Sequence, residues 1–486
     1  MWGFIEKNKN DIIYITLLLF SIVIGPYYKR IKTVENKKWA GSFLGLLLII
    51  IVSGYSAAHP IFSALFGLTA IKTTSIKKCH VTAFFFMFSY LFVFRLADKF
   101  GLPRSSGQTN LIEMIIVLRV VGVAFEMNGS WLAMQKAKKS EDKKEEIVQG
   151  EKDDEFLELI NPEFIDLFHY TFNYCGLLTG PYYRYRTFHD YFHLPFSKCV
   201  DSFDFIINTL KFVPIYISLY LAFSSIWPLE YVLTEEHNNR HFVYRMLYPW
   251  AVFAAFRQRI YAGMTLAETV CISAGLGAYP EQGRNRTGHG PTVGYMGLKK
   301  ITESEAKKML YDFKTVESME VMKCETVVTL RDSMKVWNKA VQYWVAMVVY
   351  KRFPIKPLKV HAALFVSVIW HGYHAGYFFC IYACPFYLMA EDIYFKLYYK
   401  HATGLKKNIL GFIMWFLRSH SESYQAAAFL LLTFDRIWIY YSSVHHYWYW
   451  CWLVFLAVGL LLKQLHKGND RRVTTNPTQN QEITSN

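Results

Sequence analysis

Charged residues are scarce in this chain of 486 residues. Asp, Glu, Lys and Arg make up 19% of it, whereas soluble globular proteins carry about 25%. Hydrophobic residues reach 53% and aromatic residues 18%, which excludes intrinsic disorder and collagen-like repeats. Internal repeats are also missing, which gives little support to a duplicated transporter architecture. Because apolar runs recur almost from end to end, the sequence predicts a polytopic membrane protein.

The cysteines form no recognisable disulfide or metal-binding pattern. None of the eight belongs to a CxxC pair, and most lie within apolar runs. Cysteines in such surroundings usually behave as small buried hydrophobic residues. We therefore predict no disulfide framework and no zinc site at these cysteines. No other metal site and no bound cofactor are expected either.

Positive charge exceeds negative charge, with 53 Lys and Arg against 38 Asp and Glu. The excess collects at the edges of apolar runs, as it does just after the first run, at Lys29, Arg30, Lys32, Lys37 and Lys38. Cations in such positions follow the positive-inside rule and contact anionic lipid headgroups. We therefore expect the 29–38 loop to face the cytoplasm. No zinc finger or RNP-type motif accompanies these cations, so a nucleic-acid partner is not expected.

The apolar runs predict an all-α polytopic fold. A span needs about 20 mainly apolar residues, and several runs are shorter, so we expect about 10–11 transmembrane helices. The other runs are expected to form short re-entrant or interfacial helices around an intramembrane reaction chamber. The first run is expected to be a retained anchor, because no small-residue cleavage pattern follows it. The candidate runs are 11–28, 40–56, 57–71, 79–97, 110–128, 162–180, 204–227, 242–262, 264–279, 338–353, 358–380, 381–398, 408–418, 424–442 and 446–463.

We expect residues 1–465 to form a single membrane-embedded domain. Two polar inserts interrupt it, a mixed-charge loop at 133–156 and a longer loop at 281–336. Within the longer loop, SEAKKMLYDF at 304–313 is predicted to form a short amphipathic helix. The polar tail at 466–486 is predicted to be disordered.

Ionisable side chains inside apolar runs are costly and tend to face a partner or a cavity. We expect ion pairs between helices for those in or near the early runs, which are Arg95, Glu113, Arg119 and Glu126. The segment GPYYRYRTFHDYF at 180–192 alternates aromatic rings with Arg184 and Arg186. It suits either a plain interfacial anchor or a contact with phosphate. Arg257 and Arg259, followed by Glu268, lie between two apolar stretches and need anions or a wet cavity.

The most informative polar residue is His371, in the segment IWHGYHAGYFF at 369–379. A single histidine on an apolar helix face is usually a hydrogen-bonded packing residue. Here, however, Gly372 and Gly376 allow another backbone or a ligand to come close, and imidazole suits acid–base chemistry near neutral pH. A metal site with His374 and Glu391 as further ligands lacks a HExxH-type spacing.

Asn338, in MKVWNKAVQYW, is a candidate partner of His371. It lies 17 residues before Ile355, in the middle of a proline-containing turn, and His371 lies 16 residues after it. If both arms are helical, each residue lies roughly 25 Å from the turn. An antiparallel pair of helices would then bring both residues to a similar depth in the bilayer. A kink in either arm, or arms that face apart, would separate them.

These motifs together resemble those of the membrane-bound O-acyltransferase family, in which an embedded histidine in a WHG context follows an asparagine in a WN motif. GPYYRYRTF, FRQRIYAGMTLAETVCISAGLGAYP, RDSMKVWNKAVQYWV and IWHGYHAGYFF occur in this order between residues 176 and 380. They are most similar to the branch that acylates lysophospholipids, in particular lysophosphatidylinositol. A weaker similarity covers most of residues 10–465.

The resemblance implies transfer of a fatty acyl group from acyl-CoA to the sn-2 hydroxyl of a lysophospholipid, within the endoplasmic reticulum membrane. It implies that His371 is the catalytic histidine and that Asn338 is its partner in the motif. In the mechanism that we expect, His371 is the general base, and Asn338 orients the acceptor or donates to the oxyanion. Direct transfer is favoured, because no Ser or Cys lies in a recognisable nucleophile motif. The inositol headgroup and a polyunsaturated, arachidonoyl-type chain rest on the resemblance alone. The candidate substrate contacts are Arg184, Arg186, Arg257, Arg259, His374, Trp337 and Trp370.

Other functions stay open on the sequence alone. An acyltransferase of the same family with another lysophospholipid or a protein as acceptor would carry the same motifs. A transporter or channel with the same buried charges would move a substrate without turnover and would give His371 no special role. A scaffold would lose no activity on the substitution His371→Ala. The expected partners are acyl-CoA, a lysophospholipid and the surrounding membrane lipids.

Overall fold

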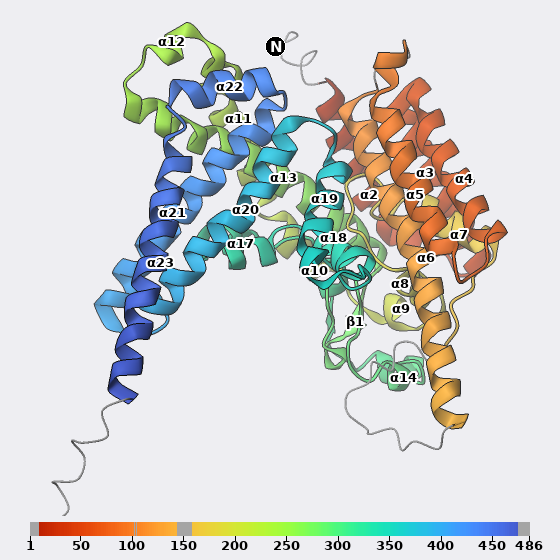
Figure 1. Ribbon diagram of the computed structural model, residues 1–486. Coiled ribbons are helices and arrows are strands. Elements are labelled where there is room, and N and C mark those ends of the chain that lie inside the picture. The colour runs from red at the N-terminus through yellow and green to blue at the C-terminus, as the bar shows by residue number, and fades with distance from the viewer. Residues whose placement is uncertain (1–8, 102, 104, 143–157, 475–486) are drawn as a thin grey trace, which may run out of the picture. The chain divides into compact units, whose positions relative to one another are not determined.

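The computed structural model describes residues 9–101, 103, 105–142 and 158–474. Nearly all regular structure in these residues is helical (Figure 1). The strands among them are β1 (Tyr279–Pro280) and β2 (Tyr311–Asp312), which pair antiparallel. The expected all-α class is confirmed, as it should be for apolar runs that must satisfy their backbone hydrogen bonds within each segment.

The described residues group into two compact units, each built from three stretches of chain. The first unit contains residues up to 219, 257–321 and 336–373. The second contains 220–256, 322–335 and residues from 374 onward. Because these stretches alternate along the chain, no single position in the sequence separates the units.

The first unit is built on a group of long helices that lie side by side (Figure 1). Its long helices are α2 (Lys9–Lys29), α3 (Val34–Ser53), α4 (Ala58–Thr73), α5 (Cys79–Arg95) and α6 (Gly107–Asp142). Shorter helices follow, namely η1 (Gly54–Ala57), η2 (Ala97–Phe100), α7 (Phe164–Phe172), α8 (Tyr185–His193), α9 (Phe196–Cys199), α10 (Phe203–Leu210), η5 (Glu281–Gly283), α14 (Tyr295–Leu298), α15 (Glu303–Ala306) and η6 (Lys314–Val316). The hairpin that carries the candidate catalytic residues consists of α18 (Lys339–Val345), the π-helical turn η7 (Ala346–Tyr350), η8 (Lys356–Leu358) and α19 (Lys359–His371).

The second unit packs α20 (Ala375–Tyr394) against α21 (Gly404–Leu431) and α23 (Tyr447–Thr474). Its aromatic core includes Tyr424, Tyr440, Tyr441 and Trp448, all buried. The helices α11 (Val213–Ile226), α13 (Phe242–Ala274), α16 (Val321–Thr326) and α17 (Leu330–Val336) carry residues of both units. The remaining helices of the second unit are η4 (Leu229–Leu233), α12 (Glu235–Asn238), the π-helical η9 (Phe395–Tyr399) and α22 (Phe434–Ser443).

Five segments of the described residues are long and apolar enough to cross a membrane, fewer than the spans expected from the sequence. They are Lys9–Lys29, Val34–Thr73, Phe203–Leu233, Ala375–Tyr399 and Tyr447–His466. Val34–Thr73 alone holds two helices joined by η1. Other long helices carry charges, since α6 contains Glu113, Arg119 and Glu126.

Several expected boundaries were wrong. The loop predicted at 133–156 begins as helix, because α6 continues to Asp142, and the tail predicted from 466 begins as helix, because α23 continues to Thr474. The rest of both segments, 143–156 and 475–486, lies outside the described residues. The helix predicted at 304–313 ends at Ala306, because Tyr311–Asp312 pairs with β1 instead. The runs 242–262 and 264–279 form one helix, α13, up to Ala274.

Arg119, on α6, is fully buried and holds an irregular turn between α7 and α8. Its guanidinium donates to the backbone oxygens of Tyr170 (3.1 Å), Thr171 (3.0 Å) and Asn173 (2.9 Å), and also to that of Cys175. The expectation of an ion pair is wrong here, because the hydrogen-bond partners of Arg119 are these backbone carbonyl groups and the hydroxyl of Tyr183 (3.2 Å). One arginine therefore satisfies acceptors that an apolar interior leaves without water.

The carboxylates of α6 have contrasting surroundings. Glu126 accepts from the backbone N–H groups of Tyr185 (2.8 Å) and Arg186 (3.3 Å), at the start of α8, and lies 3.9 Å from Nε of Arg184. It thus forms the expected contact with an arginine on another segment. Glu113 is fully buried, and neither carboxylate oxygen has a hydrogen-bond partner among the described residues.

The carbonyl contacts of Arg119 predict a large effect on stability. Arg119→Leu leaves buried acceptors unpaired, at about 1–3 kcal/mol each, so we expect lower accumulation and a clearly lower midpoint of thermal unfolding in detergent. Arg240→Leu is the control, because Arg240 forms an exposed pair with Glu236 at 2.6 Å, a type of contact that contributes little to stability. Equal unfolding midpoints for the two variants would contradict this role of Arg119.

Candidate active site

His371 is the last residue of α19 and is half-buried. Gly372 ends the helix with φ 154° and ψ −170°, a backbone conformation that is essentially restricted to glycine. The glycine of the WHG motif is therefore required by the turn that follows His371. The chain continues into α20 only at Ala375, so His371 and His374 do not share one helix.

Two buried tryptophans attach the α18–α19 hairpin to α6. Nε1 of Trp370 donates to the backbone oxygen of Met114 at 3.1 Å, and Nε1 of Trp344 donates to that of Leu118 at 2.9 Å. Met114 and Leu118 are one turn apart on α6. Trp370 therefore has a packing and anchoring role directly before His371, which its candidacy as a substrate contact did not anticipate.

These anchors relate the heights of Asn338 and His371. Asn338 precedes Trp344 by six residues, about 9 Å of helix. This places Asn338 roughly level with position 112 of α6, and His371 follows the residue that is anchored at Met114. The anchors thus agree with a similar depth for both residues, and both arms of the hairpin are helical, as expected.

Asn338 is the N-cap of α18 and has a left-handed backbone, with φ 45° and ψ 55°, which asparagine tolerates better than most residues. The next residue, Lys339, donates its backbone N–H to the oxygen of Ser318 at 2.8 Å. Ser318 in turn donates its N–H to Oε2 of Glu268 at 3.1 Å. The polar segment before α16 therefore fixes the turn at Asn338, which makes Glu268 a support of this turn.

The same turn is held from its other side. Nζ of Lys339 lies 2.5 Å from Glu317 and 2.9 Å from Glu320. Trp337 is half-buried, accepts a hydrogen bond at its backbone oxygen from Gln342, and has its ring 6.0 Å from that of Tyr261. Its ring therefore packs against α13 within the first unit.

Arg184 and Arg186 lie together at the start of α8 and are 4% and 7% exposed. Arg184 donates to the backbone oxygen of His289, and Arg186 stacks over the ring of Tyr295, 4.8 Å from its centre. Nη1 of Arg186 is buried and has no hydrogen-bond partner among the described residues. The Nη1 donor of Arg186 is therefore available to a further acceptor.

Asp190, one turn further along α8, joins α8 to the polar segment that begins after α13. It accepts from the hydroxyl groups of Tyr279 (2.7 Å) and Tyr295 (2.8 Å). Burial and the nearby Asp190 carboxylate raise the pKa of Tyr295, so its hydroxyl stays protonated and donates. This network holds the ring on which Arg186 lies.

Arg259 has a partner outside this cluster. Arg259 pairs with Asp11 of α2, 2.8 Å from Oδ1, and Asp11 also accepts from Gln108 at 2.8 Å. Arg257 is half-buried on α13. The structure thus gives Arg259 a carboxylate partner within the protein.

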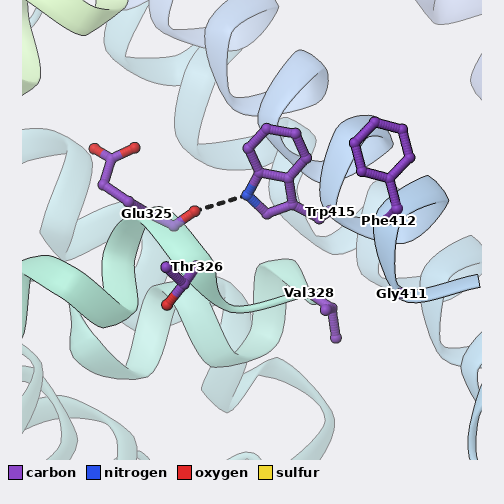
Figure 2. A pocket seen from close by; sticks show the side chains of 6 residues that line it. All are labelled: Glu325, Thr326, Val328, Gly411, Phe412 and Trp415. Atoms are coloured by element: carbon purple, nitrogen blue, oxygen red, sulfur yellow. Dashed lines mark hydrogen bonds between the residues drawn. The ribbon is translucent and has the colours of Figure 1, made fainter. Parts of the chain in front are cut away.

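His374 belongs to the second unit, where it is the N-cap of α20. That unit contains a hollow of about 580 Å³, lined by Glu325, Thr326, Val328, Gly411, Phe412 and Trp415 (Figure 2). Nε1 of Trp415 donates to the backbone oxygen of Glu325 at 2.7 Å across one wall. None of the predicted site residues lines this hollow. Among the described residues there is also no group of three or more potential metal ligands.

Comparison with known proteins agrees with the motifs. Residues 63–431 match the model of the membrane-bound O-acyltransferase family. The chain belongs to this family. It is 40% identical over 464 residues to the membrane-bound acylglycerophosphatidylinositol O-acyltransferase frj of Drosophila melanogaster, covering 94% of both chains. It is 30% identical over 453 residues to the human protein MBOAT7 of the same description, covering 92% of this chain and 93% of that one.

Membership of the membrane-bound O-acyltransferase family makes this protein a membrane-embedded O-acyltransferase. His371 and Asn338 both lie within the matched region and within one compact unit. Sequence reasoning did not find the supports of this pair, such as Ser318, because a backbone contact leaves no motif. The sequence features that could have indicated such supports were two charged residues inside or beside apolar runs, Glu268 and Arg95.

The conformation of Gly372 predicts a strong effect on acyl transfer. Gly372→Ala places a side chain at φ 154°, and a shift of about 1 Å at a reacting group can cost about 100-fold in rate. We expect a loss of that order in membranes with matched protein abundance. Gly263→Ala is the control, because nothing lies within 4 Å of the added carbon on α13. A Gly372→Ala variant with full activity would show that the turn does not orient His371.

Proposed function

We propose that this O-acyltransferase transfers a fatty acyl group from acyl-CoA to the sn-2 hydroxyl of lysophosphatidylinositol in the endoplasmic reticulum membrane. The observation that supports this most is the similarity to acylglycerophosphatidylinositol O-acyltransferases over more than nine-tenths of the chain. A polyunsaturated donor chain of the arachidonoyl type is part of the proposal and rests on resemblance to that branch.

In the proposed reaction, His371 is the general base. Its imidazole removes the proton from the acceptor hydroxyl, and the oxygen attacks the thioester carbonyl. The carbon–sulfur bond breaks, and the CoA thiolate takes the proton back from the imidazolium. Asn338, held in its left-handed turn by the contacts of Lys339, orients the acceptor or donates to the oxyanion. No covalent acyl-enzyme is needed.

The arginine cluster of Arg184 and Arg186 lies near one end of α2, and Arg259 lies near the other end. Lys29 donates through Nζ to the backbone oxygen of Val200 at 2.5 Å, and Lys37 lies 4.1 Å from the centre of the ring of Tyr191. These contacts join the basic 29–38 loop to the segment of α8 and α9. Asp11, the partner of Arg259, lies 18 residues earlier on α2, about 27 Å away along the helix.

This arrangement favours different roles for the cluster of Arg184 and Arg186 and for Arg259. With the 29–38 loop in the cytoplasm, Arg184 and Arg186 lie at the cytoplasmic end, where acyl-CoA is delivered. The unpartnered Nη1 of Arg186 suits a phosphate oxygen of the donor. Arg259 lies at the other end and is already paired.

Labelled arachidonoyl-CoA and lysophospholipids that differ only in headgroup test the proposed function. Microsomes with wild-type protein should form labelled phosphatidylinositol, and His371→Ala at matched abundance should not. Labelling of another headgroup would keep the acyltransferase and reject the inositol acceptor. Equal labelling by both proteins would reject His371 as the base, and flux of substrate without any product would favour a transporter.

The two arginine positions predict different kinetic effects. Arg186→Gln removes a charged contact to phosphate, worth about 1.5–3 kcal/mol, so the KM for acyl-CoA should rise about 10- to 100-fold. The KM for the lysophospholipid should stay unchanged. Arg259→Gln should leave the KM for acyl-CoA unchanged, because it breaks only a partly exposed pair with Asp11. The reverse pattern would place the donor at the opposite end of α2.

A further inference from the structure

Arg95, the last residue of α5, reaches the end of the helix that carries His371. Nη1 donates to the backbone oxygen of Ile369 at 2.7 Å, and Nη2 donates to that of Trp370 at 2.6 Å. Nε donates to Oδ1 of Asn110 on α6 at 2.9 Å. One guanidinium therefore binds the two carbonyl groups that precede His371.

These two carbonyl groups need a donor from outside the helix. The last carbonyls of an α-helix have no partner within it, and the helix end carries partial negative charge. Gly372 turns the chain away directly after His371. A guanidinium presents its N–H groups in a rigid fork and can bind two neighbouring oxygens in one geometry, whereas an ammonium group cannot.

The contacts of Arg95 combine with the indole anchor of Trp370. Asn110, which receives Nε, and Met114, which receives the indole N–H of Trp370, are one turn apart on α6. The backbone before His371 is thus held from α5 and from α6. The opposite side of His371 has the fixed turn at Gly372.

We propose that Arg95 is a positioning residue for acyl transfer, which binds the carbonyl groups of Ile369 and Trp370 and thereby sets the direction of the His371 imidazole. The proposal rests on His371 as the base. Arg95 itself contacts neither substrate in this account. Loss of Arg95 should therefore lower the rate of the chemical step and leave substrate affinity unchanged.

The hairpin offers a matched control in Arg352, near its turn. Nη1 of Arg352 donates to Oδ1 of Asn128 at 2.9 Å, so this arginine also attaches the hairpin to α6. It lies 19 residues before His371. Loss of Arg352 removes an anchor of the same chemical kind without touching the end of α19.

The experiment compares kcat and both KM values for wild type, Arg95→Ala, Arg95→Lys, Asn110→Ala and Arg352→Ala in membranes at matched abundance. Arg95→Ala should lower kcat about 100-fold with both KM values within about twofold, and added guanidinium ion should restore part of it. Arg95→Lys should recover only part of the rate. Arg352→Ala should retain kcat even if its unfolding midpoint falls.

The possible results separate this inference from the proposed function. Full kcat in Arg95→Ala, with His371→Ala inactive, would overturn the positioning role alone. Equal losses in Arg95→Ala and Arg352→Ala, without rescue by guanidinium, would also overturn it, because general packing would explain both. Full activity in His371→Ala would reject His371 as the base, and with it the premise of the positioning role. If Arg95→Ala does not accumulate, Asn110→Ala decides, since it should lower kcat and spare both KM values, and an unchanged kcat would overturn the inference.

Discussion

The fork of hydrogen bonds from Arg119 to the 170–175 turn is the contact on which the first unit depends. This turn lies inside an apolar body and has backbone carbonyl groups that no helix or strand satisfies. Arg119 donates to the oxygens of Tyr170, Thr171, Asn173 and Cys175, and that of Cys175 also accepts from the hydroxyl of Tyr183 at 2.9 Å. A buried acceptor without a partner costs about 1–3 kcal/mol, so loss of the other three contacts would make the buried turn unstable. Seven residues later on α6, Glu126 takes the first N–H groups of α8. The position of the Arg184 and Arg186 cluster follows from these two contacts.

The long helix α6 also sets the position of the candidate catalytic hairpin. Its backbone oxygens at Met114 and Leu118 receive the two tryptophan indoles. These two acceptors are one turn apart on one helix, so a single rigid element holds both arms of the hairpin. A reaction between two amphiphilic substrates needs its base and its polar partner at one depth. Contacts of this kind fix the hairpin that carries Asn338 and His371 against one helix.

The sequence predicted the class of fold, because apolar runs leave a local pattern that indicates helices. The WHG and WN motifs are also local, and they make His371 and Asn338 the candidates for the proposed chemistry. The supports were not predictable, because their partners are backbone atoms far away in the chain. Arg119 was expected to face a carboxylate, but its partners are carbonyl groups 51 to 56 residues later. Arg95 binds carbonyl groups 274 and 275 residues later, and no local pattern indicates such a contact. Helix ends were missed where polar sequence continued an apolar helix, as at Asp142.

The contact between α2 and α13 has a consequence for the order of assembly. Asp11 meets Arg259, 248 residues further along the chain, and Gly25 lies so close to Ser273 that an added carbon would be 2.1 Å from its hydroxyl oxygen. Both contacts pair positions 248 residues apart, so the two helices run parallel in one register. At roughly 5–20 residues per second of synthesis, the first helix waits about 12–50 s for its partner. During that interval Asp11 lacks the charge of Arg259 and Gly25 lacks the close contact with Ser273, so this side of the first unit is completed only after α13 has been synthesised.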